Sequence, residues 1–140
     1  MSDEFKLEFT SNSLNEGFAR TVVAAFLTRL NPTLEEISDV KTAVSEAVTN
    51  AIIHGYPEGA GIVLLRCGIH EGELLVEVED KGVGIEDIEA AREPLYTTRP
   101  ELERSGMGFS FMEAFMDELE IISKPGDGTL IRMKKKVGST

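Results

Sequence analysis

The most constraining feature of the sequence is the way its β-rich runs are paired along the chain. Residues 61–70 and 73–80 are rich in β-branched and aliphatic side chains, and only Glu71 and Gly72 separate them. Residues 118–124 and 129–136 form a second such pair, around a stretch that contains proline, aspartate and two glycines. Connections this short join antiparallel neighbours, because parallel strands need a crossover of a dozen residues or more. We therefore expect two β-hairpins.

Two capping-box patterns mark the starts of helices. Ser13 with Glu16 precedes a helix over residues 14–30, and Thr33 with Glu36 opens a longer helix that reaches about His54. A third helix is expected at 107–117, and the alternating residues 3–10 predict a half-buried strand. The apolar rows that the first two helices are expected to bury are Leu14, Phe18, Val22, Phe26 and Leu30, and Ile37, Val40, Val44, Val48, Ala51 and Ile52.

The order of these segments is β-α-α-β-β-loop-α-β-β. It predicts an α+β fold, a two-layer sandwich with helices on one face of a mixed, mostly antiparallel sheet. Residues 81–105 combine glycine, proline and many charges, which predicts a long loop with a short helical patch at 86–92. Such a loop in a compact domain is usually functional or mobile. The length of 140 residues fits one domain, residues 1–140, with a sizeable core.

Composition excludes several classes of protein. No apolar run is long enough to span a bilayer, and the N-terminus lacks the basic and apolar regions of a signal peptide. The single cysteine, Cys67, forms neither an internal disulfide nor a zinc cluster, so a cytoplasmic protein is expected. A net charge of −11 argues against direct binding to nucleic acid. It suits a basic protein partner, although solubility is the simpler explanation.

The first candidate site is a polar row near the end of the second helix. At 100° per residue, Glu46, Asn50 and His54 fall within an arc of about 80°, away from the apolar stripe. An ordinary solvated helix face would explain this row. A carboxylate and an amide in a row also offer the oxygen donors that Mg²⁺ prefers, with waters and phosphates completing its octahedron.

Two glycine-containing spots complete the candidate site. Asp80, Gly82 and Gly84 directly follow a predicted strand, where a carboxylate and a close backbone approach can hold a flat polar ligand. Gly106 and Gly108 stand at a loop-to-helix junction, where backbone N–H groups can bind an anion. Each spot alone is equally well explained as a turn or a helix entry. Neither the Walker A pattern nor the dinucleotide fingerprint occurs, and the protein-kinase signatures are also missing.

Taken together, the three spots resemble the N, G1 and G2 boxes of the GHKL superfamily, which has the Bergerat nucleotide fold of gyrase, Hsp90, sensor histidine kinases and MutL. The resemblance covers residues 33–135, and Gly128 and Thr129 stand where this superfamily has its last adenine-contacting pair. The segment 85–105 matches its ATP lid. The string EAVTNAIIHGY, the short lid and the length resemble the small anti-sigma factors that are also serine protein kinases.

This resemblance implies a role for each matching residue. Glu46 would be the general base, Asn50 would hold Mg²⁺ against the triphosphate, and Asp80 would accept the adenine amino group. In the lid, the hydroxyls of Thr97 and Thr98 either contact phosphate or are ordinary loop polarity. The nucleotide-binding residues that it implies are Asn50, His54, Gly55, Asp80, Gly82, Gly84, Ile85, Thr97, Thr98, Arg104, Ser105, Gly106, Met107, Gly108, Phe109 and Thr129.

The resemblance also implies the partners. The substrates would be ATP and a serine of an anti-anti-sigma protein, the second partner would be a sigma factor, and the chain would form a homodimer. Arg20, on the polar side of helix 14–30, is a candidate partner contact, although plain solvent exposure also explains it. The sequence leaves open a sporulation or a stress-response sigma factor. It also leaves open a nucleotide-gated binding module without kinase activity, a detached sensor-kinase domain and an ATPase without a protein acceptor.

Overall fold

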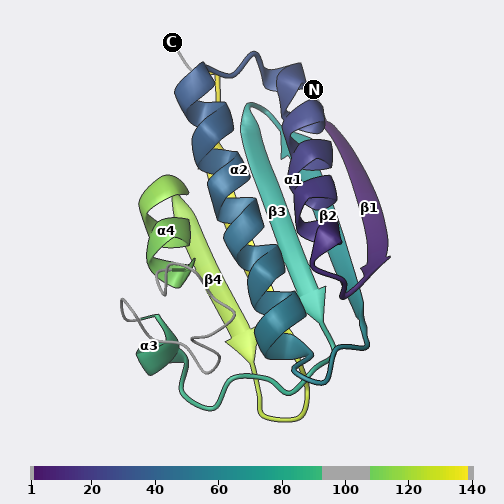
Figure 1. Ribbon diagram of the computed structural model, residues 1–140. Coiled ribbons are helices and arrows are strands. Elements are labelled where there is room, and N and C mark those ends of the chain that lie inside the picture. The colour runs from purple at the N-terminus through teal and green to yellow at the C-terminus, as the bar shows by residue number, and fades with distance from the viewer. Residues whose placement is uncertain (1, 93–107, 139–140) are drawn as a thin grey trace.

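The sheet is the base of the fold. The computed structural model describes residues 2–92 and 108–138 and places one layer of helices over a five-stranded sheet (Figure 1). The strand order is β1-β2-β3-β5-β4, and all four pairings are antiparallel. The predicted α+β class is confirmed, and the described strands include no parallel pair. The strands are β1 (Ser2–Thr10), β2 (Ile62–His70), β3 (Glu73–Asp80), β4 (Glu118–Ser123) and β5 (Thr129–Lys136).

The helices lie on one face of this sheet. The long helices α1 and α2 run side by side, and α4 lies on the other side of α2 (Figure 1). Within the described ranges, no helix is long and apolar enough to cross a membrane. The helical segments are α1 (Leu14–Leu27), a 3-10 turn (Thr28–Leu30), α2 (Leu34–Thr49), a π-helix (Asn50–Gly55), α3 (Ile88–Ala91) and α4 (Gly108–Phe115).

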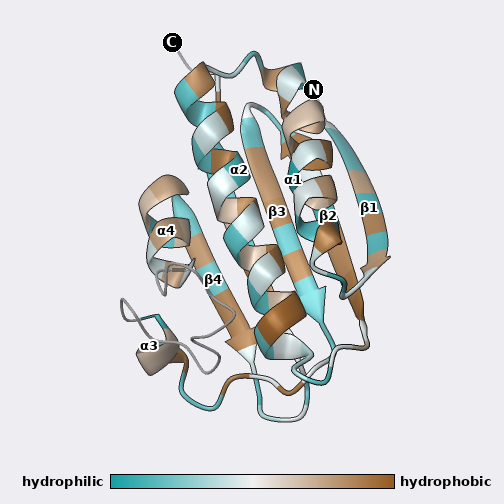
Figure 2. Cartoon of the chain, in the orientation of Figure 1, coloured by the Kyte–Doolittle hydropathy of each residue, from teal (hydrophilic) through white to brown (hydrophobic). Residues whose placement is uncertain are grey.

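The core lies between the two layers. Alternate residues of β2 and β3 are buried, and Figure 2 shows the matching bands of hydropathy along β3. From the helical side, α2 buries Val40, Val44 and Val48, as its apolar row predicts. Cys67 lies in this core, and burial raises the pKa of its thiol to about 12. Its role is therefore packing, since a protonated buried thiol is chemically inert.

The turns confirm both predicted hairpins. Glu71 and Gly72 connect β2 to β3 with φ values of 49° and 82°, the pair of left-handed conformations that a two-residue type I′ turn requires. The second hairpin joins β4 to β5 through residues 124–128. The predicted helical patch at 86–92 contains α3, which Asp87 caps by accepting a hydrogen bond from the backbone N–H of Ala90 at 3.0 Å.

One of the two predicted capping boxes is confirmed. The N–H of Glu36 donates to Thr33 Oγ1 at 3.0 Å, and the N–H of Thr33 donates to Glu36 Oε1 at 2.9 Å. The box at Ser13 is wrong, because Ser13 has helical dihedral angles and its side chain makes no cap hydrogen bond. Asn12 takes that place instead, since its Oδ1 accepts from the N–H of Leu14 at 2.9 Å.

The buried face of α1 also differs from the predicted row. Helix α1 buries Ala19, Val23, Phe26 and Leu27, whereas Leu14 is 82% exposed and Phe18 is 52% exposed. Phe26 of the predicted row is buried as expected, but residues four apart form rows on more than one side of a helix, and Leu14 and Phe18 lie beside the face that packs. The small side chain of Ala19 belongs to the face that α1 turns inward.

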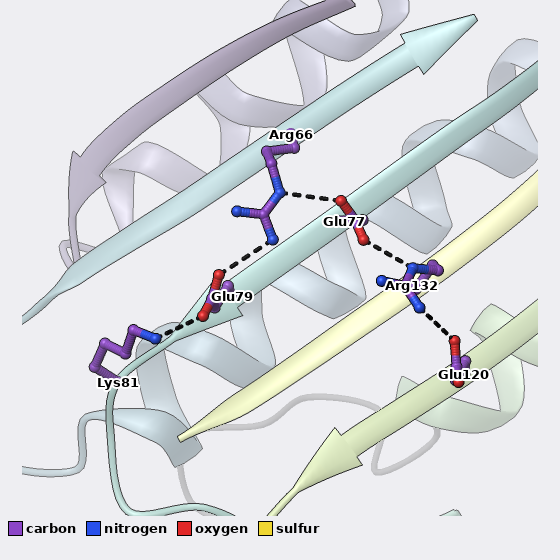
Figure 3. Close-up of polar contacts among 6 residues, drawn as sticks. All are labelled: Arg66, Glu77, Glu79, Lys81, Glu120 and Arg132. Atoms are coloured by element: carbon purple, nitrogen blue, oxygen red, sulfur yellow. Dashed lines mark hydrogen bonds and ion pairs between the residues drawn. The ribbon is translucent and has the colours of Figure 1, made fainter. Parts of the chain in front are cut away.

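The face of the sheet away from the helices carries a row of ion pairs across four strands (Figure 3). Glu77 on β3 is its centre, with Arg66 Nε at 3.0 Å and Arg132 Nε at 2.7 Å. Burial raises the pKa of Glu77, but hydrogen bonds from the two arginines outweigh burial and the pKa is lowered overall. Arg132 extends the row to Glu120 on β4, so the ion pairs reach from β2 to β4.

Candidate functional site

The candidate site lies where several chain segments end together. The end of the π-helix after α2, the end of β3 and the hairpin between β4 and β5 meet at one end of the molecule, at the bottom of Figure 1. There Asp80, Thr129 and Ser123 are direct neighbours across β3, β5 and β4. These three side chains continue the inward-facing row of each strand with polar groups in place of apolar ones.

Asp80 is the buried centre of the site. Its side chain is only 2% exposed, and its Oδ1 accepts a hydrogen bond from the N–H of Gly82 at 2.9 Å. Burial raises the pKa of this carboxyl from 3.8 to about 6, against the lowering effect of backbone hydrogen bonds from Gly82 and Thr129. At neutral pH the group is therefore mostly an ionised hydrogen-bond acceptor in a largely dry place.

Two glycines allow the backbone to close around Asp80. A Cβ on Gly55 would lie 2.7 Å from the carboxyl carbon of Asp80, and a Cβ on Gly82 would lie 1.7 Å from the carbonyl oxygen of Gly55. The N–H of Val83 donates to that same carbonyl at 2.9 Å. The absence of side chains at Gly55 and Gly82 thus brings the helix end and the loop after β3 into contact over the carboxylate.

A serine that the sequence analysis does not single out ties the loop after β3 to the last hairpin. Ser123 Oγ accepts from the N–H of Ile85 at 2.8 Å, donates to the carbonyl of Gly128 at 2.9 Å and lies 2.8 Å from Thr129 Oγ1. Ser123 is the last residue of β4, and a polar residue is typical at the end of an amphipathic strand. No local pattern in the sequence marks it as functional.

Tyr56 is a second residue that the sequence analysis misses. Its hydroxyl donates to the carbonyl of Ile62 at 2.7 Å and accepts from the N–H of Lys81 at 2.6 Å. It thereby connects the end of the π-helix to the first residue of β2 and to the residue after Asp80. Tyr56 directly follows Gly55, but nothing in the sequence indicates that its hydroxyl would reach both strands.

Glu46, Asn50 and His54 lie on α2 and on the π-helix that leads to Gly55. The regular α-helix predicted to reach His54 ends at Thr49, and the next residues form a π-helix that begins at Asn50 and ends at Gly55. A π-turn is wider than an α-turn, so His54 does not continue the α-helical row from Glu46 and Asn50. All three side chains are partly buried, and π-turns are frequent at functional sites.

A groove of about 810 Å³ between α1 and α2 opens beside Glu46. Arg20 lines the same groove from α1, where it pairs with Glu16 at 3.4 Å. Glu16 also accepts a hydrogen bond from Ser45 at 2.6 Å, which ties α1 to α2 inside the groove. The groove therefore places the predicted base and the predicted partner contact along one depression.

The remaining predicted residues divide into two groups. Gly108 and Phe109 begin α4, and the ring of Phe109 is buried in the core, so any contact from Phe109 to a phosphate would use its backbone. The others lie outside the described residues, and they are Thr97, Thr98, Arg104, Ser105, Gly106 and Met107.

Asn50 is the residue predicted to hold Mg²⁺ within a nucleotide complex. Residues 2–92 and 108–138 contain no group of three or more His, Cys, Asp or Glu side chains arranged to hold a metal ion. Asn50 contributes one amide oxygen, which suits a hard cation whose other ligands are phosphate oxygens and water. The donor set thus agrees with a metal that arrives with a triphosphate.

The pKa of Asp80 predicts a pH dependence of stability. Because the folded-state pKa of about 6 lies above the ordinary value of 3.8, the contribution of this group is fully present below pH 3.8 and is lost as pH rises towards 6. Asp80→Asn does not titrate, so the variant should gain in free energy of unfolding relative to the unchanged protein between these pH values and level off above them. Denaturant unfolding of both proteins across this range measures the difference, and a constant difference would contradict the raised pKa.

The comparisons agree with this geometry. The chain belongs to the histidine kinase-like ATPase domain family, which it matches over residues 9–135. A crystal structure of the RsbU and RsbW domains of a Mycobacterium tuberculosis protein superposes with a TM-score of 0.70 at 19% identity, covering 96% of this chain and 32% of that one. This likeness shows the fold.

Within the family, the chain belongs to the anti-sigma F factors. It is 57% identical over 140 residues to the anti-sigma F factor of Clostridium perfringens strain SM101, covering 99% of this chain and all of the relative. It is 60% identical over 134 residues to that of Thermoanaerobacter sp. strain X514, covering 96% of this chain and 94% of the relative. The anti-sigma F factor of Clostridium novyi is 59% identical over 138 residues.

Proposed function

We propose that this chain is an ATP-dependent serine protein kinase of the cytoplasm that also binds a sporulation sigma factor. In this proposal it holds sigma factor F inactive and phosphorylates a serine of an anti-anti-sigma protein. The observation that carries it is the buried Asp80 carboxylate under the Gly55–Gly82 contact, in a chain that belongs to the anti-sigma F factors. A buried carboxylate with two backbone donors at its rim suits a ligand that brings its own hydrogen-bond donor.

The base of ATP would lie against Asp80. An ionised carboxylate only accepts hydrogen bonds, and the exocyclic amino group of adenine donates one. Thr129 lies directly across the strand pair from Asp80, and Gly82, Gly84 and Ile85 form the loop that Ser123 holds beside them. These residues would line the base pocket.

The triphosphate would extend from this pocket towards Asn50. Mg²⁺ bound with the nucleotide would neutralise charge that develops on the phosphate oxygens. Asn50, at the start of the π-helix, would hold that ion through its amide oxygen, with His54 and Gly55 on the same turn. The segment 85–105 would close over the nucleotide, and Arg104, Ser105, Gly106 and Gly108 would contact phosphate.

Glu46 would act as general base for the acceptor serine. Its carboxylate would take the hydroxyl proton while the serine oxygen bonds to the γ-phosphorus, the bond from that phosphorus to the bridging oxygen breaks, and ADP leaves. Glu46 lies one helical turn before Asn50, and it lines the groove between α1 and α2. An acceptor segment entering from this groove would thus meet the base before it meets the metal-bound phosphate.

Protein partners would use the same side of the molecule. Arg20 lines the groove from α1, with 42% of its side chain exposed, and is the residue that we assign to partner binding. The net charge of −11 favours encounter with the basic surface of a sigma factor. Formation of a homodimer is part of the same proposal.

The function can be tested with γ-labelled ATP, the full chain, sigma factor F and an anti-anti-sigma protein. We expect acid-stable label on the anti-anti-sigma protein, and capture of the sigma factor in one nucleotide state and of the anti-anti-sigma protein in the other. Acid-labile label would indicate transfer to histidine, and label found only as free phosphate would indicate an ATPase. Nucleotide-dependent capture without any label transfer would indicate a binding module without kinase activity.

A further inference from the structure

Ser123 stands at the end of a row of three polar side chains on neighbouring strands. Asp80 on β3 is paired with Thr129 on β5, and Thr129 is paired with Ser123 on β4. Asp80 and Thr129 are buried, with exposed fractions of 2% and 4%. The hydroxyl groups of Thr129 and Ser123 are 2.8 Å apart, so the state of one determines what the other can offer.

Counting protons gives one self-consistent direction for this hydrogen bond. A serine hydroxyl has one proton to donate and two lone pairs to accept with. Ser123 Oγ lies 2.9 Å from the carbonyl of Gly128, which can only accept, and 2.8 Å from the N–H of Ile85, which can only donate. When its proton is donated to the carbonyl of Gly128, the remaining lone pair is free to receive the proton of Thr129.

This direction determines which hydrogen bonds Thr129 and Asp80 can offer to a ligand. With its proton committed to Ser123, Thr129 offers only lone pairs to anything that lies next to it. The ionised carboxylate of Asp80 offers only lone pairs as well. The two neighbouring residues thus form a wall of hydrogen-bond acceptors, which attracts an amino group and repels a carbonyl oxygen.

We propose that Ser123 determines which purine the site accepts, by holding the proton of Thr129 away from the ligand. The inference rests on the proposed function, in which the base of the nucleotide lies against Asp80. The 6-amino group of a 6-aminopurine can donate a hydrogen bond to these acceptors. The 6-oxygen of a 6-oxopurine is itself an acceptor, so it cannot form a hydrogen bond with them. Ser123 touches no ligand in this account, so it is a positioning residue that acts through Thr129.

Calorimetric titration of the full chain with three Mg²⁺-bound triphosphates tests the inference. The ligands are ATP, inosine triphosphate with an oxygen at position 6, and purine riboside triphosphate with only hydrogen there. In Ser123→Ala the freed Thr129 hydroxyl can rotate and donate to that oxygen. We expect the preference for ATP over inosine triphosphate to fall by about three- to tenfold, the range for one hydrogen bond. Binding of inosine triphosphate relative to purine riboside triphosphate should rise.

Two further variants separate a specific effect from a structural one. Ser123→Thr keeps the hydroxyl and should show the original preference for ATP over inosine triphosphate. Thr129→Val removes the hydroxyl oxygen and should reduce this preference while Ser123 is unchanged. An equal loss of affinity for all three ligands in Ser123→Ala, or an unchanged preference in both Ser123→Ala and Thr129→Val, would overturn the inference. Failure of the proposed function looks different, because the unchanged protein would then fail to bind ATP, or Asp80→Asn would bind it equally well.

Discussion

Glu46→Gln should lower the rate of phosphoryl transfer to the acceptor serine by about 10²- to 10⁴-fold, the usual contribution of a positioned general base. The amide keeps the shape of the side chain but cannot take up the proton of the attacking hydroxyl. Glu46 lines the groove between α1 and α2, whereas the Asp80 pocket lies at the end of the π-helix. ATP affinity should therefore stay within about threefold of the unchanged protein, because an interaction that forms only in the transition state does not contribute to ground-state binding.

Single-turnover transfer of labelled phosphate, measured beside calorimetric ATP binding, separates these two effects. The matched control is Glu35→Gln, the same chemical change at an exposed position in the first turn of α2. We expect this control to transfer phosphate at the original rate. Unchanged transfer in Glu46→Gln would remove Glu46 from the mechanism, and a parallel loss of ATP binding would mean that its role is to hold the nucleotide.

The fold could be predicted wherever its determinants are local. The hairpin at Glu71 and Gly72 follows from turn chemistry, and the capping box at Thr33 follows from the reach of two side chains over a single helical turn. Ser13 and Glu16 have the same sequence pattern, yet they form no capping box, because Glu16 makes other contacts. Glu16, which would complete that box, instead pairs with Arg20 and accepts from Ser45 of the neighbouring helix.

The residues of the candidate site also divide into those that a local sequence pattern reveals and those that it does not. Asp80 and Gly82 could be found because a carboxylate and a glycine that follow a buried strand form a compact sequence pattern. Ser123 and Tyr56 could not, because their importance comes from hydroxyl groups that reach backbone atoms on other strands. The π-turn is also invisible in the sequence, since the apolar spacing of residues 34–54 is equally typical of a continuous α-helix.

Gly82→Ala is expected to damage the nucleotide site. The added Cβ would lie 1.7 Å from the carbonyl oxygen of Gly55, and this neighbour is backbone that cannot rotate away. The loop after β3 must therefore move, which disrupts the hydrogen bond from Val83 to Gly55 and the one from Gly82 to Asp80. We expect a loss of about 1–3 kcal/mol in the free energy of unfolding. ATP affinity should fall by about tenfold or more, since a loss of about 1.4 kcal/mol in binding free energy already corresponds to that factor.

Gly68→Ala is the matched control for this substitution. Its Cβ would meet nothing closer than 3.6 Å, and neither Gly68 nor Gly82 has a left-handed backbone, so the two substitutions differ mainly in the space available. Denaturant unfolding and ATP titration of both variants separate close approach from a general intolerance of alanine. If Gly82→Ala binds ATP as well as Gly68→Ala does, the contact between Gly55 and Gly82 is not what shapes the pocket. If only Gly82→Ala loses affinity for ATP, the shape of the pocket depends on the contact between the backbone of the helix end and the loop that follows Asp80.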